Sequence, residues 1–413
     1  MAANDFYDTL ETRDPDQRRR EQLAALVAQI DNAKQNSPVW AERLTDMNSA
    51  DFGGLDALAA LPRIRKTDLA DHQKAAPPLG GLNAVPVSDM AHIFMSPGNI
   101  FEPDSANADH WRFGRALFAA GVRKGDIVHN TFSYHLTPAG MLVESAARAI
   151  GCPVFPAGVG NTELQVQAMA HIRPNAYGGT PSFLKILLDK AADMDADISS
   201  LTKASVGAEP LPPSLRKEFI ERGVFTTQSY GTADLGLVSY ESEAMDGMIL
   251  DEGVIVEIVD PESGVPVEDG EVGEITVTTF NPVYPLFRFA TGDLSAIMPG
   301  GSPCGRTNTR IRGWLGRADQ STKVRAMFVH PKLVADVASR HPEIAKARLV
   351  LTNPENRDTM VLHCEVDGAA EGLADAVAGS IQTVMKLRGE VEIIAAGSLP
   401  TDGLLIDDQR TYD

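Results

Sequence analysis

Cysteine is scarce in this chain, and long apolar runs are missing. Only three cysteines occur in 413 residues, and the spacing of Cys152, Cys304 and Cys364 forms no pair. This excludes a disulfide scaffold and is typical of a reducing compartment, so a cytoplasmic protein is expected. No apolar run approaches the roughly 20 residues that span a bilayer, and the polar first 20 residues lack the apolar core of a signal peptide.

Positive charge is also in deficit. Lys and Arg number 37 against 56 Asp and Glu, which gives a net charge of −19. Such a balance repels phosphate backbones and anionic membranes, so neither nucleic acid nor a membrane is expected as a partner. Hydrophobic residues at 43% and charged residues at 23% are typical of a folded protein. Because domains usually hold roughly 100 to 200 residues, two or three packed units are expected.

The N-terminal part begins with a predicted helix. Between Asp16 and Asn36, apolar residues recur at the three-and-four spacing of one helix face, and Ser37-Pro38 ends the pattern. A second helical stretch punctuated by proline follows over Leu55 to Leu69. The Pro/Gly-rich segment from Ala75 to Pro86 then predicts a long connection.

The middle of the chain predicts a parallel sheet. From Asp109 to Gly223, helical patterns alternate with short apolar runs at residues 127–128, 153–156, 176–178 and 204–207. Alternation of this kind is typical of parallel strands joined by crossover helices. The later runs at residues 254–259 and 274–278 flank turn residues, which predicts antiparallel strands.

The last segment, residues 319–413, predicts a small α+β unit. Helices are expected near 332–340 and 373–387, and strands near 347–351 and 361–366.

Several short motifs follow one another in a set order. They are Gly207-Ala208-Glu209-Pro210, Ser229-Tyr230-Gly231-Thr232-Ala233-Asp234, Phe287 to Leu294, Gly316-Arg317-Ala318-Asp319 and Lys323-Val324-Arg325. The succession resembles the adenylate-forming (AMP-binding) superfamily. The N-terminal helix, Asn36-Ser37-Pro38, Gly207 to Pro210 and Cys304-Gly305-Arg306-Thr307 resemble its phenylacetate-CoA ligase branch, from about Tyr7 to Pro400.

The resemblance implies an α/β fold with a large adenylate-forming N-terminal domain of mixed sheets, residues 1–318. A small, mobile α+β C-terminal domain, residues 319–413, would follow. It implies an AMP-forming ligase that uses ATP, Mg²⁺ and CoA to convert a small carboxylic acid into its CoA thioester. Members of this branch often form dimers, which leaves a homodimer open for this chain.

The resemblance also implies roles for individual residues. Gly207, Ala208, Glu209 and Pro210, with Tyr230, Gly231 and Thr232, would line the adenine slot, and Ser96 and Gly98 would hold phosphate. Asp293 would accept the ribose hydroxyls, and Arg317 would contact the same sugar or phosphate. Catalytic roles fall to Asp234, Arg317 and Lys323, and Asp319 would be the hinge. The alternative is that Gly207 and Gly231 only serve strand ends.

A magnesium site is expected at Asp234. This residue stands where the family usually has a metal-binding Glu, and the shorter side chain still permits ligation through water. The alternative is a solvated turn carboxylate. For Cys304, neighbouring cysteines that would complete a zinc site are absent, so no zinc cluster is expected.

The acyl pocket is expected at strand ends that face the nucleotide. Phe132, Tyr134, His135, Ala157 and Gly158 are its candidate residues. Aromatic side chains there suit an apolar or aromatic acid. Packing of Phe132 in the core is an equal alternative.

Two parts of the ATP-handling machinery depart from the family pattern. In the phosphate-loop segment Met95 to Pro103, Pro97 removes an amide donor, and Ile100-Phe101 replace polar residues. Near the C-terminus, Leu404 occupies the place of the adenylation lysine after Gly403, and no lysine follows Lys386. Weakened triphosphate binding and slow adenylation are therefore expected.

These departures leave a second possibility open. The chain would then be a catalytically inert relative that binds a nucleotide or acyl-CoA and acts as a sensor or partner subunit. Arg410 would replace the missing lysine only if the tail folds back.

Overall fold

The computed structural model describes residues 6–96, 99–320, 322–324, 327–352, 354, 358–368, 372–400 and 404–410. The chain forms two compact units. One comprises Met1–Thr291 and Ala296–Trp314, and the other comprises Gly292–Ser295 and Leu315–Asp413. The chain therefore passes from one unit to the other after Thr291, Ser295 and Trp314.

The N-terminal region is built on one long helix, α1 (Pro15–Asn36). The Asp14 side chain accepts hydrogen bonds from two amides of the first turn, and Pro15 stands at the first helical position. The helix ends at Asn36, which confirms the predicted helix. The elements that follow are α2 (Pro38–Arg43), η2 (Ser49–Asp51), η3 (Leu55–Ala60), β1 (Ile64–Arg65), α3 (Lys66–Ala75) and η4 (Val87–Asp89); η1 (Thr9–Thr12) precedes α1.

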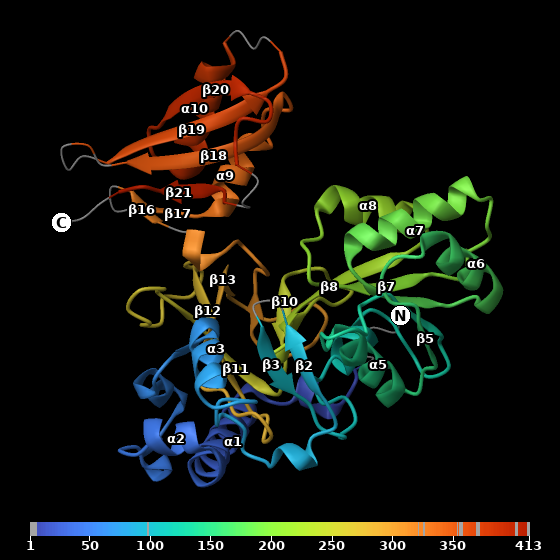
Figure 1. Cartoon of the computed structure of the whole chain (residues 1–413), viewed down its shortest axis with the longest axis vertical. Coiled ribbons are helices and arrows are strands. Elements are labelled where there is room, and N and C mark those ends of the chain that lie inside the picture. The colour runs from blue at the N-terminus through green and yellow to red at the C-terminus, as the bar shows by residue number, and fades with distance from the viewer. Residues whose placement is uncertain are drawn as a thin grey trace. The chain divides into compact units, whose positions relative to one another are not determined.

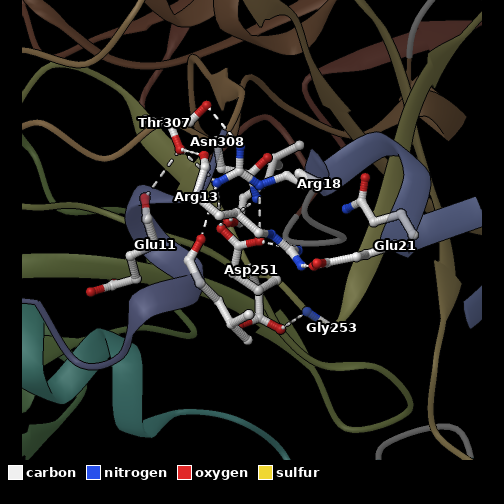
Figure 2. A network of polar contacts seen from close by, with 12 residues as sticks. Glu11, Arg13, Arg18, Glu21, Asp251, Gly253, Thr307 and Asn308 are labelled. Atoms are coloured by element: carbon white, nitrogen blue, oxygen red, sulfur yellow. Dashed lines mark hydrogen bonds and ion pairs between the residues drawn. The ribbon is translucent and has the colours of Figure 1, made fainter. Parts of the chain in front are cut away.

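Buried charges fasten this region to later parts of the chain. Arg18 donates to both carboxylate oxygens of Glu252, at 3.0 and 3.2 Å. It also donates to the hydroxyl of Thr307 at 2.8 Å (Figure 2). Glu11 accepts a 2.9 Å hydrogen bond from the Arg306 guanidinium, and both side chains are buried. Because a buried charge left without its partner is costly, the N-terminal segment is an integral part of the first unit.

A nine-stranded mixed sheet forms the centre of the first unit, in the order β14-β15-β10-β9-β8-β7-β6-β4-β5. Its parallel part confirms the four predicted strands, β4 (Val128–Asn130), β5 (Val154–Pro156), β6 (Ala176–Gly179) and β7 (Lys203–Val206). It also contains β8 (Phe225–Thr232), which the apolar runs did not predict. Figure 1 shows α7 (Pro181–Asp193) and α8 (Pro213–Glu221) on one face of these strands and α5 (Ala139–Ile150) on the other. The remaining helices here are α4 (Gly114–Ala119) and α6 (Thr162–Ile172).

Antiparallel strands complete the first unit. The mixed sheet continues through β9 (Gly236–Tyr240), β10 (Met248–Leu250), β14 (Ile297–Met298) and β15 (Arg310–Ile311). A four-stranded sheet has the order β1-β13-β12-β11, in which β11 (Val254–Val259) and β12 (Gly273–Thr279) pair antiparallel as predicted. In the same sheet β1 pairs parallel with β13 (Phe289–Ser295), whose residues 292–295 are counted with the second unit. A short hairpin joins β2 (Ile93–Ser96) to β3 (Ile100–Pro103).

The second unit is an α+β fold, as predicted. Its main sheet has the order β20-β19-β18-β21, and α9 and α10 pack on it (Figure 1). Buried Leu349, Leu362, Val377 and Ile381 form the centre of its core. Its elements are η5 (Ala318–Gln320), β16 (Thr322–Val324), β17 (Met327–Val329), α9 (Pro331–Ala338), β18 (Ile344–Thr352), β19 (Thr359–Val366), α10 (Leu373–Met385), β20 (Glu390–Ala395) and β21 (Ile406–Asp408).

The residue pattern predicted one further segment of the first unit correctly and another only in part. Residues 76–86, all described, contain neither helix nor strand, which confirms the expected connection. The expected helical stretch over residues 55–69 is instead divided into η3, β1 and the start of α3, with Pro62 at the break. In the described part of the chain, no helix has the length and apolar character needed to cross a membrane.

Candidate active site

An apolar cavity of about 320 Å³ lies at the carboxyl ends of the parallel strands. Ligands of open α/β sheets commonly bind at this edge. One wall is mainly apolar and consists of Phe113, Leu117, Phe132, Thr137, Pro138, Ala139, Leu142 and Val143. The other wall follows the ends of β2, β7 and β8 and consists of Ser96, Ser205, Gly207, Ala208, Ser229, Gly231, Thr232 and Ala233. No charged side chain is among these residues, so the cavity suits an uncharged ligand group.

Glycine is required on the strand side of this cavity. A Cβ atom at Gly231 would lie 2.4 Å from the carbonyl oxygen of Gly236, which no real Cβ tolerates. At Gly207 it would lie 3.2 Å from both the backbone oxygen and the hydroxyl of Ser229. Both glycines therefore serve the backbone packing of strand ends, and both also line the cavity.

The other predicted residues of the adenine slot lie close by in the chain. Ala208 has a left-handed backbone, with φ of 65°. Glu209 accepts a hydrogen bond from the amide of Ser182 at 3.3 Å, while Pro210 is exposed. Tyr230 is half-buried in β8 and packs against the main core of the unit. Thr232 caps the turn after β8, since its hydroxyl accepts from the amide of Leu235.

Asp234 lies in the turn between β8 and β9 and has a lysine partner. The Lys66 ammonium is 3.1 Å from Oδ2 of Asp234, whose side chain is fully buried, whereas the Lys66 side chain is 37% exposed. Oδ1 of Asp234 is buried and has no hydrogen-bond partner in the described structure. The pair presents a positive charge at the surface and a free carboxylate oxygen beneath it.

Ser96 and Glu102 face each other across the β2–β3 hairpin. The Ser96 hydroxyl donates to one carboxyl oxygen of Glu102, and the Glu102 side chain is buried. Burial, followed by the nearby charge of Asp234, raises the pKa of Glu102 to about 8. Gly98 and Pro97, the other notable residues of this loop, lie outside the described residues.

Helix α3 holds this hairpin in place. The Gln73 amide donates to the carbonyl of Phe101 at 2.7 Å and accepts from its backbone amide at 2.8 Å. Lys66 and Gln73 thus connect one helix to both the turn after β8 and strand β3.

Asp293 and Arg317 come together within the second unit. Their backbones form an isolated bridge, and Arg317 Nη1 lies 3.4 Å from Asp293 Oδ1. Gly292 has φ of 75°, and a Cβ there would be 2.7 Å from the Arg317 guanidinium. Asp319 lies in η5 and Lys323 in β16; their side chains are outside the described part.

The C-terminal segment lies along β18. The Leu404 side chain is 39% exposed, and its carbonyl accepts from the Arg348 guanidinium at 3.1 Å. Arg410 is engaged by Asp358 and Asp408 inside the second unit. Gly403 lies outside the described residues.

Four predicted pocket residues lie outside the lining of the cavity. Only Phe132 contributes to it, and Phe132 also packs against buried residues of α5 and β4. The Tyr134 hydroxyl accepts from the Asn130 amide, His135 is exposed, and Ala157 and Gly158 follow β5. The apolar wall is instead built largely from residues at and just before the first turns of α4 and α5, which carry no motif.

Lys66 is the residue that pattern reading missed. It is separated from Asp234 by 168 positions, and nothing in its local sequence distinguishes it from neighbouring cations such as Arg65 or Lys74. Only the fold reveals the pair.

The residues present fit a magnesium ion at Asp234. Mg²⁺ is usually bound through one or two carboxylates together with substrate phosphates and water. The buried Asp234 Oδ1, which has no partner in the described structure, is an oxygen of the required kind.

The chain is similar to known proteins along nearly its whole length. The model of the AMP-binding enzyme family matches residues 134–281. A phenylacetate-coenzyme A ligase of Thermus thermophilus is 32% identical over 344 residues, which cover 79% of this chain and 75% of the relative. One from Pseudomonas putida is 28% identical, covering 95% of this chain and 94% of the relative.

Solved structures agree on the fold. An open conformation of 2-hydroxyisobutyryl-CoA ligase, in complex with 2-HIB-AMP and CoA, superposes with a TM-score of 0.86 at 22% identity, covering 99% of this chain and 97% of that one. The α/β fold with a large domain of mixed sheets and a smaller C-terminal domain is thereby confirmed. The inert alternative receives no support from these relatives. The chain belongs to the phenylacetate-CoA ligase family of the adenylate-forming enzymes.

Proposed function

We propose that this chain is an AMP-forming ligase that joins an apolar or aromatic carboxylic acid to CoA. The acid's carboxylate attacks the α-phosphate of ATP, which gives an acyl adenylate and diphosphate. The thiolate of CoA then displaces AMP and forms the thioester. The observation that carries the proposal is the uncharged cavity bounded by Gly207 and Gly231, in the same unit as the Lys66–Asp234 pair.

Residues of the first unit bind both halves of the adenylate. The segments 207–210 and 230–232 line the base, and the apolar wall around Phe132 receives the acyl group. Asp234 would hold Mg²⁺, which would neutralise phosphate charge. The partly exposed ammonium of Lys66 offers a second positive charge to the phosphates.

A further group of residues is proposed to serve the sugar and the conformational step. Asp293 accepts hydrogen bonds from the ribose hydroxyls, and Arg317 contacts the same sugar or phosphate, with Lys323 as a further catalytic group. We propose that residues 1–318 act as the AMP-binding domain. Residues 319–413 would then swing about Asp319 between the two half-reactions.

Adenylation is proposed to be slow. Leu404 offers no charge where the family has its lysine, and Arg410 is bound by Asp358 and Asp408. Loss of a positioned cation typically costs on the order of 3 kcal/mol, or a hundredfold or more in rate. The thioester step does not use this residue and is expected to be retained.

We also propose a cytoplasmic location. Cys152, Cys304 and Cys364 are all buried free thiols, as expected in a reducing compartment.

The test is AMP release by the purified protein given ATP, Mg²⁺, CoA and a panel of aryl and aliphatic acids. Leu404→Lys and its uncharged control Leu404→Gln are assayed in parallel. We expect acid-dependent AMP and thioester in the wild type, and a rate at least tenfold higher in Leu404→Lys only. Absence of AMP in every variant would overturn the ligase proposal, while equal rates in all three would overturn slow adenylation.

A further inference from the structure

Two buried carboxyl groups near the proposed phosphate site each have one oxygen without a partner. Glu102 is 1% exposed, and its Oε1 accepts from the Ser96 hydroxyl, but its Oε2 has no partner in the described structure. Asp234 has a fully buried side chain, and its Oδ2 is bound by Lys66, but its Oδ1 likewise has no partner there.

These two carboxyls lie close enough to affect each other. After burial, the charge of Asp234 is the largest cause that raises the pKa of Glu102, and Tyr284 experiences the charges of both. An unsatisfied carboxylate oxygen in the interior is costly, and two of them side by side also repel. The arrangement therefore requires a compensating positive group.

The neighbouring side chains supply this charge only in part. The Lys66 ammonium acts to lower the pKa of Glu102, but it is bound to the other oxygen of Asp234. The Gln73 amide nitrogen is occupied by the carbonyl of Phe101 and the hydroxyl of Tyr284. A proton on Glu102 would neutralise that carboxyl, yet no hydrogen bond from it reaches Asp234 Oδ1 in the described structure.

We propose that Glu102 is a metal ligand, and that it binds one divalent cation together with Asp234. Hard cations such as Mg²⁺ and Mn²⁺ prefer carboxylate oxygens, and two carboxylates are a common set. The second carboxylate compensates for the short Asp234 side chain, which stands where the family usually has Glu. Glu102 would thus give the metal site of this chain a second carboxylate ligand from the protein. The inference rests on the proposed function only in assigning this cation to the nucleotide.

The test measures metal binding without turnover. Free Mn²⁺ is followed by electron paramagnetic resonance while it is titrated into the full-length protein, into Glu102→Gln and into Asp234→Asn. Glu257→Gln is the matched control, because Glu257 is also buried with a raised pKa and pairs with Arg288 away from this site. We expect one saturable site in the wild type and control, and at least tenfold weaker binding in the two site variants.

Wild-type Mn²⁺ affinity in Glu102→Gln would overturn the inference, as would absence of Mn²⁺ binding by the wild type. If Glu102→Gln fails to fold, Glu102→Asp serves instead, because the shorter side chain withdraws the oxygen and is expected to weaken binding several-fold. Unchanged affinity there would overturn the inference too. Because binding is read without ATP, failure of the ligase proposal would appear separately, as absent AMP release with metal binding intact.

Discussion

The Lys66 ammonium lies 3.1 Å from the buried carboxylate of Asp234, and this contact joins the first turn of α3 to the turn after β8. The ion pair with Asp234 fixes the direction of the Lys66 side chain, which remains 37% exposed. A cation held in this way loses little freedom when it meets a phosphate, so it is suited to stabilise developing charge. Its importance increases in a chain that has Leu404 at the place of the family lysine.

Replacing Lys66 by methionine is expected to slow adenylation at least tenfold. The variant keeps the aliphatic stem and removes only the charge, so the loss reports on the cation. Acid-dependent diphosphate release measures the step, and Lys74→Met, on the same helix, is the control. An undiminished rate in Lys66→Met would remove Lys66 from the proposed machinery.

Filling the apolar cavity is expected to weaken binding of the acid without weakening binding of ATP. Ala139 lines the cavity at the start of α5, and Ala139→Leu adds bulk where the acyl group is proposed to bind. The KM for the acid should rise at least tenfold, with the KM for ATP little changed. Ala149→Leu, at the exposed end of the same helix, should leave both constants as they are. If the KM for the acid is unchanged in Ala139→Leu, the acyl group binds at another place.

Stability should depend on pH through Asp109. Burial raises the pKa of this carboxyl from 3.8 to about 7, and its Oδ1 has no hydrogen-bond partner in the described structure. Between pH 4 and 7 the folded chain holds a proton that the unfolded chain has released, so stability falls as the pH rises through this window.

The variant Asp109→Asn removes this titration. At pH 8 it should be more stable than the wild type by roughly 1 to 3 kcal/mol, and the difference should shrink towards pH 4. Urea unfolding at several pH values measures it. A constant difference across this range would show that the Asp109 carboxyl does not titrate there.

Truncation of Glu11 is expected to destabilise the first unit strongly. Glu11 accepts from the Arg306 guanidinium and from the Tyr240 hydroxyl, and its loss leaves the buried Arg306 charge with only the longer 3.8 Å contact to Glu243. Glu11→Ala should cost about 3 to 5 kcal/mol in free energy of unfolding. Glu21→Ala removes a 46% exposed carboxylate at the edge of the same network and should cost far less, because solvent screens an exposed ion pair. Comparable losses in both variants would contradict this assignment.

Much of the fold can be predicted from the periodicity of apolar residues, whereas only part of the candidate active site can be predicted from the sequence. The apolar runs at residues 127–128 and 204–207 predict two parallel strands because such patterns are local. The motif order places Gly207 and Gly231 at strand ends, where they line the cavity. Phe132, Tyr134 and His135 were all expected in the same wall, yet of these three only Phe132 lines the cavity, while the Tyr134 hydroxyl accepts from the Asn130 amide.

The contacts that could not be predicted join distant parts of the chain. Lys66 and Asp234 are 168 positions apart. Gln73 binds the backbone of Phe101, and because a backbone contact does not depend on the residue type at position 101, the sequence does not indicate it. The burial of Glu102 has the same origin, because the loop motif indicates its place in sequence but not the environment of its side chain.

The pairing of Glu11 with Arg306 spans 295 positions, and it has a consequence for synthesis of the chain. A ribosome releases the N-terminal helix long before Arg306 emerges from the exit tunnel. Until then Glu11 and Arg18 lack their partners, since Glu252 and Thr307 also come late. The first unit therefore completes its fold only after Arg306 and Thr307 have emerged, and Glu11 and Arg18 cannot be buried in their native pairs before that point.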